Sequence, residues 1–189
     1  AQSPANLVSD LYAVTGDILH KKGEEQEAFA AYDSCLQWKD DNVMALNNYA
    51  YYLSEKGVDL HKAESMSYKT IKAEPNNGTY LDTYAWILFM EERYADAKTY
   101  IDQALKNRDS TVDNSTVLEH AGDIYYMNGM ADESVDFWKK AYTGENQTEV
   151  LAWKIKNRQY ITEEELKKRN APKQKPAATK KSVRKGKKK

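Results

Sequence analysis

The sequence has one cysteine in 189 residues, Cys35, which excludes an internal disulfide bond. It has no apolar run of about eighteen residues, so no transmembrane helix is predicted. It lacks both an initiator methionine and a charged segment followed by an apolar one. We therefore expect any targeting segment to be absent or already removed. No stretch alternates polar and apolar residues for long enough to indicate a β-sheet.

The motifs of common catalytic and cofactor sites are missing as well. The three histidines and the cysteine make a poor zinc-binding set, because neither HExxH nor paired CxxC occurs. The phosphate-binding sequences GxGxxG and GxxxxGKS or GxxxxGKT are absent, and so is the nucleophile motif GxSxG. We predict that the chain is not an enzyme and that it holds neither a metal nor a cofactor.

The sequence does contain a repeated spacing. A small residue is followed seven positions later by a glycine or its substitute, and five or six positions after that by alanine or serine. The last members of the four sets are 35, 34 and 37 residues apart. A period of this length, with two helix-length segments per unit, is typical of stacked helical hairpins. The four sets are Gly16, Gly23 and Ala28; Ala50, Gly57 and Ala63; Ala85, Glu92 and Ala97; and Gly122, Gly129 and Ser134.

Each unit reads as two amphipathic helices joined by a tight turn. In the third unit, Leu81, Tyr84 and Leu88 recur at helical spacing before the turn, and Ile101 and Leu105 do so after it. Small residues allow two helices to approach closely, so we expect the small positions to mark where the paired helices cross. We expect the turn glycines to adopt the positive φ that is favoured just after a helix end.

With these features the chain resembles tetratricopeptide-repeat proteins of the bacterial type. The segment LEHAGDIYYMNGMADESVDFWKKAY matches the family pattern best, and the resemblance covers about residues 6–160. It implies an all-α, right-handed α-solenoid of about four helical hairpins, closed by a C-terminal capping helix. We expect residues 1–162 to form this domain, as the C-terminal part of a longer array. Cytoplasm and cell envelope or periplasm both remain open as compartments.

The C-terminal residues differ in charge from the rest. From Lys167 onward there are twelve Lys or Arg and no acid, which leaves 16 basic against 29 acidic residues in 1–166. We predict that residues 163–189 form a short helix and then a disordered basic tail. Before it, residues 144–161 read as the capping helix, with Lys154, Lys156 and Arg158 expected to be exposed. The tail's cations that could contact nucleic acid or anionic lipid are Lys180, Lys181, Arg184, Lys185, Lys187, Lys188 and Lys189.

The resemblance also implies a binding surface, because the first helix of each tetratricopeptide unit lines the concave side. Transferring the inward-facing positions of the family to this chain gives a groove with acidic and aromatic side chains. Such a surface suits a basic or mixed-charge partner segment, through charge steering and cation–π contacts. The predicted groove residues are Asp10, Asp17, Asn47, Tyr51, Asp82, Trp86, Phe89, Glu119, Asp123 and Tyr126.

We predict from this that the chain is a scaffold or adaptor that binds a protein or peptide partner in its groove. The alternative is association with nucleic acid or an anionic envelope surface through the basic tail, with the repeats as a spacer. A third possibility is a regulatory subunit of an enzyme encoded elsewhere. The tail could also dock in the acidic groove, within one molecule or between molecules.

Overall fold

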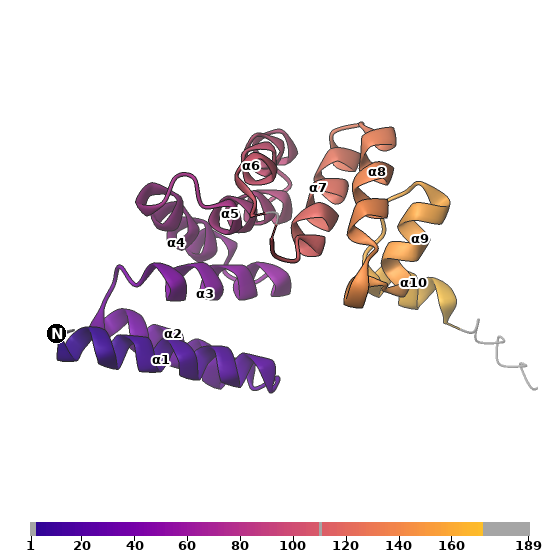
Figure 1. The fold of residues 1–189 in the computed structure, drawn as a ribbon. Coiled ribbons are helices and arrows are strands. Elements are labelled where there is room, and N and C mark those ends of the chain that lie inside the picture. Colours follow the sequence, from indigo (N-terminus) through magenta and orange to yellow (C-terminus); the bar gives the residue numbers. More distant parts are fainter. Residues whose placement is uncertain (1–2, 110, 172–189) are drawn as a thin grey trace, which may run out of the picture.

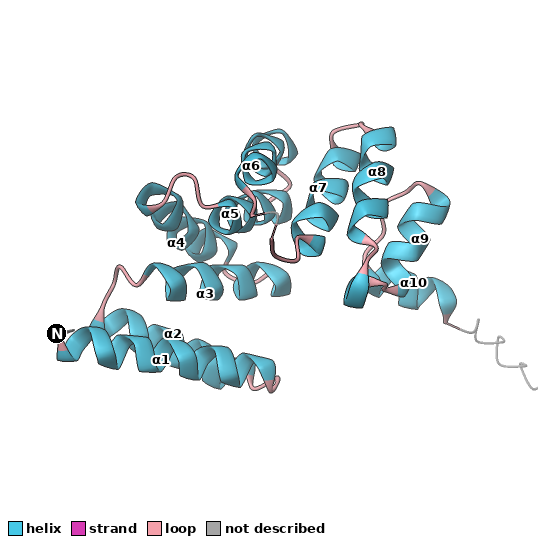
Figure 2. Cartoon of the chain, viewed as in Figure 1, coloured by secondary structure: helices cyan, strands magenta, loops and turns pink. Residues whose placement is uncertain are grey.

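The structure is a computed structural model that describes residues 3–109 and 111–171. In this part of the chain it consists of ten α-helices and one short 3-10 helix, without a strand (Figures 1 and 2). The predicted disordered tail, 172–189, lies outside the described residues. The helices are α1 (Pro4–Lys21), α2 (Glu25–Trp38), α3 (Val43–Lys56), α4 (Leu60–Ala73), α5 (Gly78–Met90), α6 (Tyr94–Asn107), α7 (Ser115–Met127), α8 (Ala131–Ala141), η1 (Gly144–Asn146), α9 (Glu149–Asn157) and α10 (Glu163–Asn170).

The helices pair in sequence order into four hairpins, α1 with α2, α3 with α4, α5 with α6 and α7 with α8. Successive hairpins stack side by side, so the chain forms a one-dimensional array in which each unit packs on its neighbours (Figure 1). The apolar core follows the array as three successive clusters, and the last contains Trp138 and Leu151. The predicted all-α solenoid is thus confirmed.

The turn position of each hairpin has the predicted backbone conformation. Gly23, Gly57 and Gly129 have φ of 79°, 64° and 79°. Glu92, which replaces glycine in the third hairpin, has φ of 61°. This left-handed region is sterically costly for a residue with a Cβ, so the third turn is strained at Glu92. The second turn carries similar strain two residues after its glycine, at Asp59, whose φ is 47°.

The small residues lie where paired helices cross. A Cβ on Gly122 would come within 3.0 Å of the indole ring of Trp138, and a Cβ on Gly16 would overlap the ring of Tyr32. Ser134 occupies a position that holds alanine in the other repeats, and it is fully buried. Its hydroxyl donates to the Gly122 carbonyl at 2.8 Å, so the extra oxygen is satisfied at the crossing.

The two ends of the array differ. At the C-terminal end, α9 packs on α8, and α10 begins with a capping box in which Thr162 and Glu165 satisfy each other's backbone N–H groups. At the N-terminal end, α1 exposes an apolar stripe formed by Leu7, Leu11, Val14 and Ile18. Thr83 and Ile87, the counterparts of Val14 and Ile18 two repeats later, are buried by neighbouring helices.

Candidate protein-binding groove

The first helices of the last three hairpins, together with α9, line one surface. A cavity of about 470 Å³ has walls from α3, α5, α7 and α9, and residues 160–163 close one side. We call it the aromatic cavity because Tyr51, Trp86 and Tyr160 line it. A second cavity of about 660 Å³ adjoins it and shares Glu55, Glu119, Val150 and Glu163. We call this one the acidic cavity. Its remaining lining residues are Thr148, Glu149, Leu166, Lys167, Asn170 and Ala171.

The two cavities together carry an excess of negative charge. Besides His120, their ionic lining consists of two lysines, Lys154 and Lys167, and five carboxylates, Glu55, Glu119, Asp123, Glu149 and Glu163. Glu55 is exposed and accepts the Tyr51 hydroxyl at 3.0 Å. No cation pairs with Glu55 among residues 3–109 and 111–171. The groove formed by the two cavities therefore favours a positively charged ligand group.

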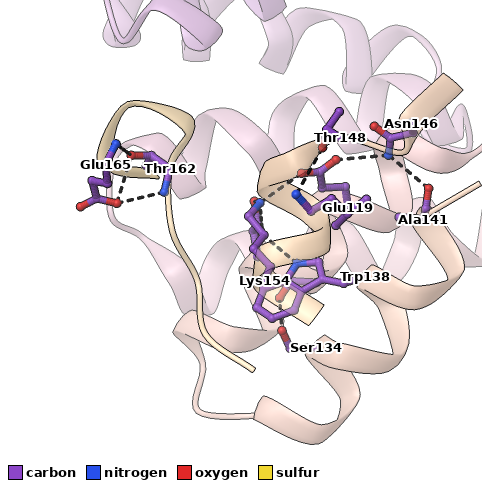
Figure 3. Close-up of polar contacts among 12 residues, drawn as sticks. Glu119, Ser134, Trp138, Ala141, Asn146, Thr148, Lys154, Thr162 and Glu165 are labelled. Atoms are coloured by element: carbon purple, nitrogen blue, oxygen red, sulfur yellow. Dashed lines mark hydrogen bonds and ion pairs between the residues drawn. The ribbon is translucent and has the colours of Figure 1, made fainter. Parts of the chain in front are cut away.

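A buried charge network forms the floor next to α9. The Nζ of Lys154 lies 2.8 Å from both carboxylate oxygens of Asp123. It also lies 3.1 Å from Oε1 of Glu119 (Figure 3). The indole N–H of Trp138 donates to Asp123 at 2.8 Å. Lys154 and Asp123 are each only 3% exposed. Burial raises the pKa of Asp123, and the Lys154 ammonium beside it acts in the opposite direction.

Lys154 is therefore not exposed, and the prediction that it faces solvent was wrong. Leu151, three residues earlier on α9, is also buried. Residues three apart share a helix face, so Leu151 and Lys154 are buried together. The neighbouring Lys156 and Arg158 are exposed, as predicted.

A second buried pair joins α5 to α7. Nδ1 of His120 lies 3.0 and 3.1 Å from the two carboxylate oxygens of Asp82. The imidazole stacks on Trp86, with ring centroids 4.1 Å apart and planes 13° from parallel. Burial alone would lower the pKa of His120, but the Asp82 carboxylate, with smaller contributions from Asp123 and Glu119, raises the pKa overall.

This pair predicts a pH-dependent stability. The folded-state pKa of His120 lies above its ordinary value of 6.5. The stability that protonated His120 contributes to the folded state is therefore fully present below pH 6.5. The contribution is lost as pH rises through the folded-state pKa, by at most about 1.4 kcal/mol per pH unit. Urea denaturation at a series of pH values measures it. His120→Gln should remove this slope, whereas His61→Gln, at an exposed position, should retain it. An unchanged slope in His120→Gln would contradict the assignment.

Four of the ten predicted groove residues line the aromatic cavity: Tyr51, Trp86, Glu119 and Asp123. The other six lie elsewhere. Asp82 is buried behind His120, and Phe89 packs on Trp86 and Tyr160. Tyr126 is partly buried against Trp138. The remaining three lie toward the N-terminal hairpins: Asp17 accepts from Tyr32 and Asn48, Asn47 is buried, and Asp10 accepts from Asn42.

Several lining residues were missed by the sequence analysis. Glu55 and Tyr160 fall outside the family positions that were transferred to this chain, and His120 was considered only as a zinc ligand. Glu163 lies in a segment that was predicted to follow the solenoid domain. In the structure Ile161 and Leu166 are buried, so the chain after α9 packs against the array and brings Tyr160 and Glu163 to the groove.

The structure also bears on metals and membranes. Within residues 3–109 and 111–171, no three side chains of His, Cys, Asp or Glu come together in a way that could hold a metal ion. None of the helices in the same part of the chain has the length and apolar character needed to cross a membrane.

Several known proteins with a similar helical arrangement are tetratricopeptide-repeat proteins. No protein-family model matches the chain. A curated Pseudomonas aeruginosa protein named as TPR repeat-containing is 35% identical over 66 residues, which are 35% of this chain and 11% of that protein. The structure of Pseudomonas aeruginosa PilF matches with a TM-score of 0.68 at 16% identity, over 82% of this chain and 69% of PilF.

A third similar protein is YrrB, described as a TPR protein with an unusual peptide-binding site. Its structure matches with a TM-score of 0.55 at 18% identity, over 78% of this chain and 74% of YrrB. The hairpin array and these likenesses show that the chain has the tetratricopeptide-repeat fold, which it shares with bacterial proteins. The predicted resemblance is thereby confirmed.

Proposed function

We propose that the chain is a protein-interaction scaffold that binds a segment of a partner protein in the groove. The observation that supports this most directly is the convergence of α3, α5, α7 and α9 on one cavity. Tyr51 and Trp86 supply half-buried aromatic surface there, next to the Glu55 carboxylate. Aromatic side chains in a partly desolvated pocket commonly contribute much of the binding energy at protein interfaces.

The charge of the groove defines the kind of partner. Lysine and arginine combine an apolar stem with a cationic end, so one side chain can cover an aromatic ring and reach a carboxylate. The excess of carboxylates over lysines around the two cavities adds long-range attraction for such a segment. We therefore propose a partner segment with Lys or Arg next to apolar residues. YrrB, which has a similar fold and is described as having an unusual peptide-binding site, supports a peptide segment as the kind of partner.

Peptide selection tests the proposal. Peptides selected from a random-sequence display library against the full chain should be enriched in Lys or Arg beside apolar residues. Trp86→Ala should weaken their affinity by about tenfold or more, because a central aromatic anchor is lost. Trp38→Ala is the matched control, because Trp38 is exposed on α2 and lines neither cavity, and it should leave the affinity nearly unchanged.

Trp86 also stacks on Phe89 and His120, so its replacement could disturb the fold as well as the site. Glu55→Gln provides a second variant at an exposed position, and it should weaken basic peptides without changing thermal stability. The proposal is wrong if no peptide is enriched, or if both groove variants bind the selected peptides as tightly as Trp38→Ala does.

A further inference from the structure

The acidic cavity lies where the basic tail leaves the described part of the chain. Ala171, the last described residue, is itself a lining residue of this cavity. The preceding helix α10 is held in place by the buried Leu166 and by Asn170, whose Nδ2 donates to Glu149 at 3.1 Å. The guanidinium of Arg169 lies 5.2 Å from the ring centroid of Trp153. The tail therefore starts from a fixed point at the rim of the cavity.

The tail and the cavity have opposite charges. Residues 172–189 contain nine Lys or Arg and no acid. The cavity presents Glu55, Glu119, Glu149 and Glu163, and Val150 and Leu166 add apolar wall. Of these carboxylates, Glu119 is paired with the buried Lys154. Glu163 is paired with Lys167, which also lines the cavity, on the same exposed helix turn; such a surface pair contributes little energy and is readily exchanged. The cavity is thus suited to the chemistry of the segment that begins at its edge.

The tail is also close enough to bind its own groove. An extended residue spans about 3.3–3.6 Å, so Lys173 and Lys175 remain within about two to four residue lengths of Ala171. Because the tail is covalently joined to Ala171 at the rim of the cavity, its effective concentration there is in the millimolar range, so even weak contacts within the molecule are populated. The later lysines then extend far enough to reach the adjoining aromatic cavity, where Tyr51 and Trp86 lie.

We propose that residues 172–189 bind in the acidic cavity of their own chain and compete with basic partner segments for the groove. This inference rests on the proposed function of the groove, and it adds regulation to it. A partner must displace the tail, so weakly basic segments are rejected and strongly complementary ones are accepted. Any polyanion that binds the tail, such as nucleic acid or an anionic lipid surface, would open the groove to the partner.

Competition with a probe peptide tests this inference. The probe is a fluorescein-labelled synthetic peptide with the sequence of residues 172–189, and fluorescence anisotropy measures its affinity. The chain shortened after Ala171, which retains every described helix, should bind the probe about fivefold or more tightly than the full chain, because no tethered competitor remains. A full-length variant with the nine tail Lys and Arg replaced by Gln should behave like the shortened chain.

The charge contacts are tested on the shortened chain. The double variant Glu55→Gln/Glu163→Gln should weaken probe binding about threefold or more at low salt, and raising the salt should weaken binding to the unaltered cavity. Glu27→Gln/Glu133→Gln removes two exposed carboxylates that line neither cavity, and it should leave the affinity unchanged. Equal probe affinity for the full, shortened and neutral-tail chains would overturn the inference, and so would equal effects of the two double variants.

Measurements on the full and shortened chains also show whether the tail inference or the proposed function is the one that fails. If the selected partner peptides bind the full and shortened chains equally well, and still depend on Trp86, the tail does not compete, although the groove binds peptides. If the probe binds in the cavity but no partner peptide is selected against either the full or the shortened chain, the proposed function fails and the tail contact stands. Binding of duplex DNA or anionic vesicles by the tail, with no change in probe affinity on shortening, would also overturn the inference.

Discussion

We expect Lys154→Met to lower the free energy of unfolding by about 3–5 kcal/mol, because it leaves the Asp123 carboxylate buried without a cation. Methionine preserves most of the volume of the lysine stem, so the loss reports mainly on charge. Chemical denaturation followed by circular dichroism measures the change. The loss in free energy of unfolding should become smaller as the pH is lowered, because burial raises the pKa of Asp123 and the protonated acid carries no charge.

Two further variants establish whether the buried pair is the cause. Lys156→Met changes an exposed lysine on the same helix and should cost no more than about 0.5 kcal/mol. The double variant Asp123→Asn/Lys154→Met removes both charges and keeps an acceptor for Trp138, so it should be more stable than Lys154→Met alone. If Lys154→Met costs no more than Lys156→Met, the network does not stabilise the fold.

Gly122→Ala is expected to destabilise the chain by about 2–3 kcal/mol, since the added methyl group overlaps the buried indole of Trp138. Alanine is favoured over glycine in a helix by about 1 kcal/mol, which offsets only part of this cost. The ring cannot move freely, because it is fully buried and its N–H is bonded to Asp123. The midpoint of denaturant unfolding provides the measurement.

Gly16→Ala provides a comparison in which a smaller loss of stability is expected. A Cβ there approaches Tyr32 less closely than a Cβ at Gly122 approaches Trp138, so the loss should be smaller. The hydroxyl of Tyr32 bonds to Asp17, and this contact limits how far the ring can shift. Equal losses for the two variants, or no loss at Gly122, would mean that the Trp138 ring has room to adjust and that the crossing is looser than described.

The fold could be predicted because its determinants are local and repeat. Each hairpin carries its own turn residue and its own small residue at the crossing, so the four sets support one another. Glu92 lies at the position of the repeat where the other three units have glycine, and it has the same positive φ as those glycines. The short polar helix α10 lies where a short helix was predicted after the solenoid domain, and in the structure it begins with a capping box at Thr162 and acids in its first turn.

The groove was harder to predict, because its properties depend on pairs that are distant in sequence. Asp123 and Lys154 are 31 residues apart, and Asp82 and His120 are 38 apart. Positions on a helix face show which acids point toward the concave side. They do not show whether a cation from another unit neutralises them there. A partial signal existed in α9, where the spacing from Leu151 to Lys154 places both on one face.

The apolar stripe on α1 has a consequence for how the molecule opens. In a linear array each unit is stabilised mainly by its neighbours, and within residues 3–109 and 111–171 α1 packs mainly on α2 and α3. The opposite end is covered by α9 and α10. Local unfolding should therefore begin at Leu11 and its surroundings, and hydrogen exchange in the first hairpin should outpace exchange around Trp138. Within the described residues, the first hairpin is therefore expected to open before the hairpins that line the groove.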